Sequence, residues 1–67
     1  MKVIINNQTL YLFKGARVRD AINTFASEYP GNMPDEPYSV TDRDGNMVMP
    51  DGRLSENDKL FIKPKNS

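Results

Sequence analysis

The chain has 67 residues, of which 37% are hydrophobic, and it contains no Cys, His or Trp, so one domain over residues 1–67 must build its core without disulfide or thiolate-metal staples. Its nine basic and nine acidic residues cancel, which leaves no net field to attract nucleic acid or an anionic membrane. No apolar run approaches the ~20 residues of a membrane span and the polar start is no signal peptide, so we expect a soluble, cytoplasmic protein.

The first two segments predict an N-terminal β-hairpin. Residues 2–6 and 9–14 are rich in β-branched and aromatic side chains, which favour strands. Between them, Asn6-Asn7-Gln8 provides Asn residues, which tolerate the positive φ of a tight turn. Apolar side chains fall on both faces of these strands, so the strands are either partly covered on both sides or expose an aromatic surface that includes Tyr11 and Phe13.

A single helix is predicted over residues 18–29. Its apolar residues recur at spacings that place them on one helical face, namely Val18, Ile22, Phe25, Ala26 and Tyr29. Pro30 and Gly31 should end the helix, because the residue before Pro is pushed out of the α region and Gly supplies a left-handed exit. The Pro-rich stretch 30–37 then forms a loop.

The second half of the chain predicts three more strands. Segments 38–41 and 46–49 flank Asp42-Arg43-Asp44-Gly45, whose Asp and Gly residues are typical of a hairpin turn. Residues 59–63 have the apolar density of a buried strand, and Pro64 should end it because Pro cannot donate to a ladder. The predicted order is β-β-α-β-β-β, an α+β fold with a mixed sheet packed on one helix.

Charge is unevenly distributed along the chain. Residues 1–29 carry four basic and two acidic side chains, residues 30–58 carry two basic and seven acidic ones, and residues 59–67 carry three basic ones. If the first and last segments are neighbours in space, a basic patch forms beside an acidic one. Ordinary solvated charge is the alternative.

Three stretches of the sequence carry a family resemblance. They are residues 1–8 (Met-Lys-Val-Ile-Ile-Asn-Asn-Gln), residues 15–22 (Gly-Ala-Arg-Val-Arg-Asp-Ala-Ile) and residues 54–62 (Leu-Ser-Glu-Asn-Asp-Lys-Leu-Phe-Ile). In this order they resemble ThiS and MoaD, small sulfur-carrier proteins with the ubiquitin-like β-grasp fold. The second stretch is similar to the family's Gly-x-Thr-Val-x-Asp-Leu-Leu helix entry and the third to its Leu-x-x-Gly-Asp-x-Val-x-Ile approach to the last strand. The resemblance covers nearly the whole chain and implies a β-grasp fold.

Two departures from the family pattern bear on stability and function. Arg17 stands where the family places Thr or Ser as helix N-cap, which forgoes a hydrogen bond of about 1 kcal/mol unless another acceptor serves the first turn. The family's last strand leads into a tail that ends in Gly-Gly, whose terminal carboxylate carries the chemistry. Here residues 62–67 are Ile-Lys-Pro-Lys-Asn-Ser, so neither sulfur-carrier nor conjugating activity transfers to them.

We predict no catalytic, cofactor-binding or metal-binding residue. Without His or Cys the chain has no imidazole base, no thiolate nucleophile and none of the usual zinc or haem ligands. Residues 42–46 superficially resemble a calcium loop. With Asp42 in its first position, however, Met47 stands where such a loop needs Gly and Arg53 where it needs Glu, so a hairpin turn explains the segment.

Methionines on the segment 46–49 offer a candidate contact surface. Met47 and Met49 share one face across Val48, and their flexible, polarisable side chains suit a protein interface if that face is open. The alternative is that both methionines face the helix and Val48 faces water.

RNA binding is a further alternative, by analogy of fold with the β-grasp TGS domains of RNA-associated proteins. Basic residues and one aromatic residue could combine cationic and stacking contacts, namely Lys14, Arg17, Arg19, Lys63, Lys65 and Tyr11. The neutral chain argues against it, because a domain that neutralises several phosphates is ordinarily basic.

The function we predict is a non-catalytic, monomeric module that binds a protein partner such as an adenylating or sulfur-transfer enzyme. It is either free-standing or the N-terminal domain of a longer chain, for example one with a ThiF-like enzyme. By analogy with the sheet face and tail of ubiquitin-like proteins, the predicted contacts are Phe13, Met47, Met49, Lys63 and Lys65. A sulfur carrier whose Gly-Gly tail lies beyond Ser67 is the second reading.

Overall fold

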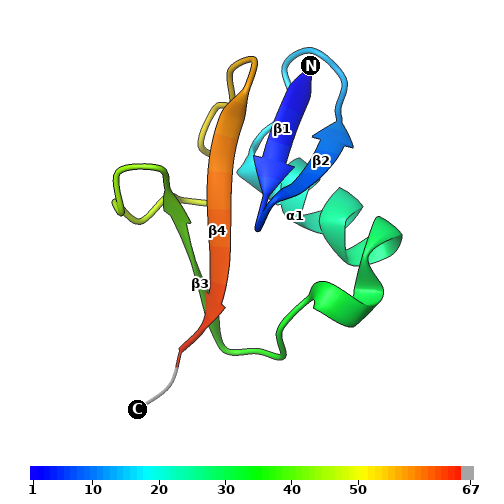
Figure 1. Ribbon diagram of the computed structural model, residues 1–67. Helices are drawn as coiled ribbons and strands as arrows, with labels where there is room; N and C mark the ends of the chain where they lie inside the picture. Colours follow the sequence, from blue (N-terminus) through cyan, green and yellow to red (C-terminus); the bar gives the residue numbers. More distant parts are fainter. Residues whose placement is uncertain (66–67) are drawn as a thin grey trace.

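The computed structural model describes residues 1–65. Its elements are β1 (Lys2–Ile5), β2 (Gln8–Tyr11), α1 (Val18–Glu28), the 3-10 helix η1 (Pro30–Asn32), β3 (Tyr38–Asp42) and β4 (Asp58–Pro64). The strands form one sheet in the order β2-β1-β4-β3. β1 pairs antiparallel with β2 and parallel with β4, and β3 pairs antiparallel with β4. The sheet is therefore mixed, and its two central strands come from opposite ends of the chain (Figure 1).

Two residues form the turn of the N-terminal hairpin. Asn6 and Asn7 take φ values of 48° and 70°, which confirms the positive φ expected of these Asn residues. Gln8 belongs to β2 and pairs with Ile5, so it is not part of the turn.

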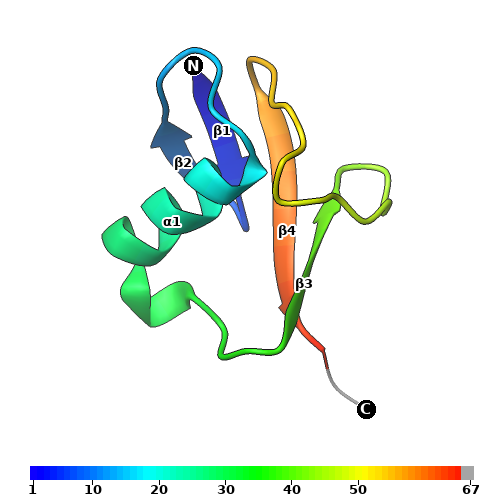
Figure 2. The same cartoon turned by 180° about the vertical axis from the view of Figure 1, so that it is seen from behind.

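Helix α1 packs on one face of the sheet (Figure 2). It ends one residue before the predicted boundary, and Val18, Ala21, Ile22 and Phe25 form its buried face. The other buried side chains come from the strands and the β2–α1 loop, namely Val3, Ile5, Leu10, Leu12, Ala16, Leu60 and Ile62. Within residues 1–65, no helix has the length and apolar character that crossing a membrane requires.

A distant loop caps the start of α1. Arg17 is the N-cap residue and its side chain makes no capping hydrogen bond. Instead, the N–H of Val18 donates to the Gly52 carbonyl and the N–H of Arg19 to the Pro50 carbonyl, both at 2.9 Å. The backbone N–H of Arg17 donates to Oδ2 of Asp20 at 2.8 Å. Other acceptors therefore replace the missing Ser or Thr hydroxyl, as the first turn requires.

The end of α1 differs from the prediction in one detail. Tyr29 is the C-cap, and its N–H donates to the Phe25 carbonyl at 2.8 Å. Gly31 does not adopt a positive φ, so it supplies no left-handed exit. The chain continues as the 3-10 helix η1 instead, in which the Asn32 N–H donates to the Tyr29 carbonyl at 2.9 Å.

The predicted strand around Met47 is not formed. Met47 makes only an isolated antiparallel bridge with Thr41, followed by one hydrogen bond of 3.0 Å from the Val48 N–H to the Val40 carbonyl. The chain then leaves the edge of β3, because residues 50–52 turn toward α1 and cap it. The element order is β-β-α-β-β, one strand fewer than predicted, in a fold of the predicted α+β class.

Candidate functional site

Within residues 1–65, one face of the sheet carries no helix. Val3, Leu10 and Leu60 point to α1 and are buried, so strand alternation places their neighbours on the other face. The register aligns Ile4 with both Thr9 and Lys59. We call this surface the open face; its residues are Lys2, Ile4, Thr9, Tyr11, Ser39, Thr41, Lys59, Phe61 and Lys63.

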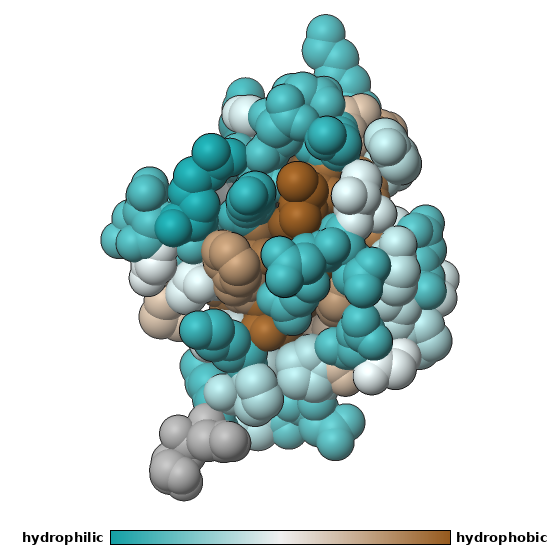
Figure 3. Space-filling view, in the orientation of Figure 1, coloured by the Kyte–Doolittle hydropathy of each residue, from teal (hydrophilic) through white to brown (hydrophobic). Residues whose placement is uncertain are grey.

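The middle of the open face is apolar. Ile4 and Phe61 come from the two central strands and are half-buried, although neither packs against the core. Phe61 lies opposite Thr41, which in turn bridges to Met47, so Met47 extends this row beyond the edge of β3. Figure 3 shows the apolar area in the middle of this face, surrounded by hydrophilic side chains.

Lysines frame the apolar centre. Because β1 and β4 are neighbours, they bring Lys2, Lys59 and Lys63 to the same face from the two ends of the sequence. The first and last segments of the chain are thus neighbours in space, which was the condition for a basic patch. Lysine stems can cover apolar surface while their ammonium groups stay in water, so a partner would meet an apolar centre with a cationic rim.

The structure places the predicted apolar contacts on two sides of the molecule. Met47 and Met49 are 67% and 68% exposed while Val48 packs against the core, so the alternative in which the methionines face the helix is wrong. Phe13 is 63% exposed and Tyr11 is 76% exposed, which confirms an exposed aromatic surface. Phe13 follows β2, however, and β2 and β3 are opposite edges of the sheet, so Phe13 does not cluster with the methionines.

The predicted basic contacts lie at the end of β4. Lys63 is exposed on the open face, opposite Ser39. Lys65 is exposed beyond the strand, where its N–H donates to the Pro37 carbonyl at 3.0 Å. Asn66 and Ser67, the last two residues of the tail, lie outside the described residues.

The basic residues considered for RNA binding do not form one surface. Lys14, Arg17 and Arg19 lie around the start of α1, near the end of the sheet where β1 and β4 begin. Lys63 and Lys65 lie at the far end of β4, a seven-residue strand. A strand of that length spans about 20 Å, so the two groups occupy opposite ends of the domain.

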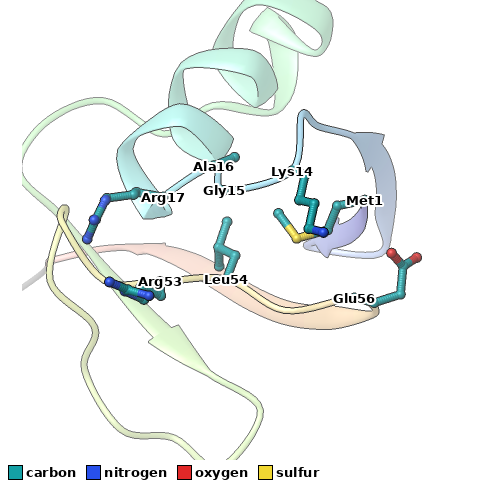
Figure 4. Close-up of a pocket in the computed structure, with 8 residues that line it drawn as sticks. All are labelled: Met1, Lys14, Gly15, Ala16, Arg17, Arg53, Leu54 and Glu56. Carbon is teal, nitrogen blue, oxygen red and sulfur yellow. The ribbon is translucent and has the colours of Figure 1, made fainter.

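A groove lies at the first of these ends. It has a volume of about 600 Å³ and is lined by Met1, Lys14, Gly15, Ala16, Arg17, Arg53, Leu54 and Glu56. Figure 4 shows Arg17 and Arg53 at one end of this groove, Leu54 in its middle, and Lys14 beside Met1 toward the other end. We call it the basic groove.

The segment that resembled a calcium loop is a hairpin turn. Oδ1 of Asp42 accepts from the N–H groups of Asp44 and Asn46 at 2.9 and 3.0 Å, and Gly45 takes a φ of 83°. The carboxylate is thus committed to its own backbone, as in an Asx-turn. Among residues 1–65, no three or more acidic side chains gather as a metal site would need.

Comparison with solved structures identifies the fold. SAMP1 from Haloferax volcanii, a ubiquitin-like small archaeal modifier, matches this chain with a TM-score of 0.71 at 15% sequence identity. The match covers 98% of this chain and 94% of that one. The fold is a β-grasp. No family model and no curated protein matches the sequence. The resemblance to ThiS and MoaD therefore rests on the three stretches of this β-grasp chain quoted above.

Some residues of the open face of this β-grasp domain were not among the predicted contacts. Ile4 and Phe61 form its apolar centre, and Lys2 and Lys59 belong to its rim. The sequence contained a signal for this apolar centre. Ile4 is an apolar residue between the buried Val3 and Ile5, and Phe61 is one between the buried Leu60 and Ile62, so both point to the opposite face. The basic groove had no such signal, since Arg17 and Arg53 meet only in the folded chain.

Proposed function

We propose that this chain is a non-catalytic, ubiquitin-like module that binds a protein partner through the open face of its sheet. The observation that carries the proposal is the apolar row from Ile4 through Phe61 to Met47, which neither the helix nor the core covers. Exposed apolar areas with a polar rim mark protein interfaces, because burying them removes apolar surface from water.

The partner class follows from the resemblance to ThiS and MoaD. An adenylating or sulfur-transfer enzyme in the cytoplasm would engage the open face, with Lys63 and Lys65 contacting it at the end of β4. The module would act as a monomer, either free-standing or as the N-terminal domain of a longer, ThiF-like chain. Phe13, at the opposite edge from Met47 and Met49, would contact a partner only if the interface spans the whole face.

A sulfur carrier is the second candidate. It is favoured by the exposed end of β4, where residues 63–65 all lie on the surface and a tail could enter an enzyme channel. The discriminating observation is whether the natural gene product continues past Ser67 and reaches Gly-Gly. RNA binding has less support, because the basic residues it would use lie at opposite ends of the domain.

Affinity capture from lysate of the source organism tests the main proposal. Three baits are compared: the wild type, the open-face variant Tyr11→Ala/Met47→Ala, and the helix variant Asn23→Ala/Ser27→Ala. All four side chains are exposed, so each variant should keep the wild-type circular dichroism spectrum.

The expected result is an adenylating or sulfur-transfer enzyme that is retained by the wild type and the helix variant and lost by the open-face variant. Loss of the enzyme with the helix variant instead would overturn the proposal. So would equal capture by all three baits, because binding would then not use the open face.

A further inference from the structure

We propose that the basic groove binds a short acidic segment of a protein partner, at a site separate from the open face. The proposal does not rest on the open face being an interface, because none of the residues that line the groove belongs to that face. It commits to an occupant with two properties: clustered carboxylates and at least one apolar side chain.

The groove has an apolar floor that is fixed in place. Met1 and Leu54 are partly buried and pack against the core, and Ala16 is buried. The N-terminal amine of Met1 donates to the Leu12 carbonyl at 2.8 Å, which holds the residue at the start of β1. This floor suits an apolar side chain and does not need to reorganise to receive one.

Two arginines are forced together above this floor. Arg17 and Arg53 are paired across an isolated antiparallel bridge, an arrangement in which like charges destabilise a fold. Arg17 also occupies the N-cap of α1, where a cation meets the positive end of the helix dipole. Lys14 adds a third cation. Each of these features is unfavourable alone, and a bound anion would relieve all of them.

Two nearby carboxylates accept hydrogen bonds from backbone N–H groups. Oε2 of Glu56 accepts from the Lys2 N–H at 3.1 Å, and Oδ2 of Asp20 accepts from the Arg17 N–H at 2.8 Å, so both carboxylates are directed to backbone groups. The Arg17 guanidinium donates to the Asp51 carbonyl at 2.7 Å. A guanidinium carries several N–H donors, so this bond leaves others for a ligand.

The surroundings favour a short acidic peptide over a nucleic acid. A neighbouring groove shares Arg53 and Leu54 with the basic groove and is lined by Asp42, Asp44 and Asp58. A phosphate backbone that continued past Arg53 would run into these acids. A peptide can place its carboxylates on the arginines and present neutral or basic residues to the acidic side.

The test is an NMR titration of the 67-residue chain with the blocked peptide Glu-Glu-Leu-Glu-Glu and with its neutral counterpart Gln-Gln-Leu-Gln-Gln. We expect the acidic peptide to shift the amide signals of Gly15, Ala16, Arg53 and Leu54. The neutral peptide should shift them far less. Raising NaCl from about 0.05 M to about 0.5 M should weaken the acidic peptide's binding severalfold, because the contacts are exposed ion pairs.

Two matched variants locate the site. Lys14→Gln/Arg53→Gln should bind the acidic peptide about threefold to tenfold more weakly, as expected for the loss of two exposed ion pairs. Lys59→Gln/Lys63→Gln removes the same number of charges from the open face and should bind like the wild type. The salt dependence in wild type keeps the test valid if the first variant folds poorly.

Three results would overturn the proposal: equal shifts by both peptides, shifts that map to the open face, or larger groove shifts from a short oligouridine than from the acidic peptide. Failure of the open-face proposal would be seen separately, since neither Tyr11 nor Met47 lines the groove and Tyr11→Ala/Met47→Ala should bind the acidic peptide normally.

Discussion

The side-chain amide of Asn6 pairs with the backbone of Ile62 as if it were one more residue of a strand. Its Nδ2 donates to the Ile62 carbonyl at 3.0 Å and its Oδ1 accepts from the Ile62 N–H at 2.9 Å. β1 itself ends at Ile5, so this amide continues the parallel β1–β4 ladder beyond the strand. One residue thus forms the hairpin turn and extends the sheet.

Replacing Asn6 should separate these two roles. Asn6→Gly keeps the positive φ but loses both hydrogen bonds, so we expect a free energy of unfolding lower by about 1 to 2 kcal/mol. Asn6→Ala should cost about 1 kcal/mol more, because Ala also disfavours the left-handed region. Urea unfolding measures both. Asn7→Gly, at the other positive φ, is the control and should stay near wild type; an Asn6→Gly variant as stable as this control would contradict the role of the amide.

A side chain at Gly52 should be crowded, since an added Cβ would lie 3.1 Å from the Met49 carbonyl and 3.4 Å from Cγ2 of Val18. We expect Gly52→Ala to lower the free energy of unfolding by about 1 to 2 kcal/mol. It should also speed hydrogen exchange at the Val18 amide, which the Gly52 carbonyl caps.

Gly31→Ala is the matched control. A Cβ at Gly31 meets nothing within 4 Å and its φ is not in the left-handed region, so its stability should stay within about 0.5 kcal/mol of wild type. Equal losses in the two alanine variants would show that the loop at Gly52 does not hold the start of α1.

Arg17→Ser should stabilise the domain while weakening the basic groove. Because other acceptors already serve the first turn, the gain comes from removing a cation from the helix N-terminus, and we expect about 0.5 kcal/mol despite the lost bond to Asp51. Peptide binding should fall severalfold in the same variant.

Arg43→Ser is the comparison for Arg17→Ser. Arg43 also donates to a backbone carbonyl, that of Asn57 at 2.9 Å, but it belongs to the turn after β3 and not to the N-cap of α1. Its loss should lower stability slightly or leave it unchanged. If thermal unfolding shows both serine variants destabilised alike, the cost assigned to a cation at this N-cap is wrong.

Asp42→Ala should destabilise the turn without involving calcium. The variant leaves the N–H groups of Asp44 and Asn46 without their acceptor, at a cost of about 1 to 2 kcal/mol. Asp44→Ala, at an exposed position of the same turn, should be close to neutral. Millimolar calcium should leave the melting temperature of the wild type unchanged; a rise of several degrees that Asp42→Ala abolishes would show a metal site instead.

Periodicity and turn chemistry predicted most of the fold. The spacing of Val18, Ile22 and Phe25 located α1 to within one residue, and the Asn pair located the first hairpin. These features are local, so a short window of sequence contains them. The strand predicted around Met47 does not form, although residues 46–49 alternate as a strand would. The residues that follow leave the edge of β3 and cap α1 through the carbonyls of Pro50 and Gly52.

The candidate surfaces were predicted less completely, for a physical reason. Exposure of Met47 depends on which face of residues 46–49 is turned toward α1, and both orientations were open in the sequence until the structure placed Val48 against the core. The meeting of Arg17 and Arg53 depends on a pairing between residues far apart in sequence. No local pattern encodes such a contact.

The parallel pairing of β1 with β4 gives this small domain a demanding folding reaction. Both inner strands lie near the ends of the sequence, so the middle of the sheet forms only when the chain closes a loop of about fifty residues. Such non-local pairing slows folding and makes it all-or-none. A ribosome-bound chain that has not yet released residues 58–64 lacks an inner strand, and its N-terminal hairpin has no partner on one side. Folding should therefore begin after synthesis of β4.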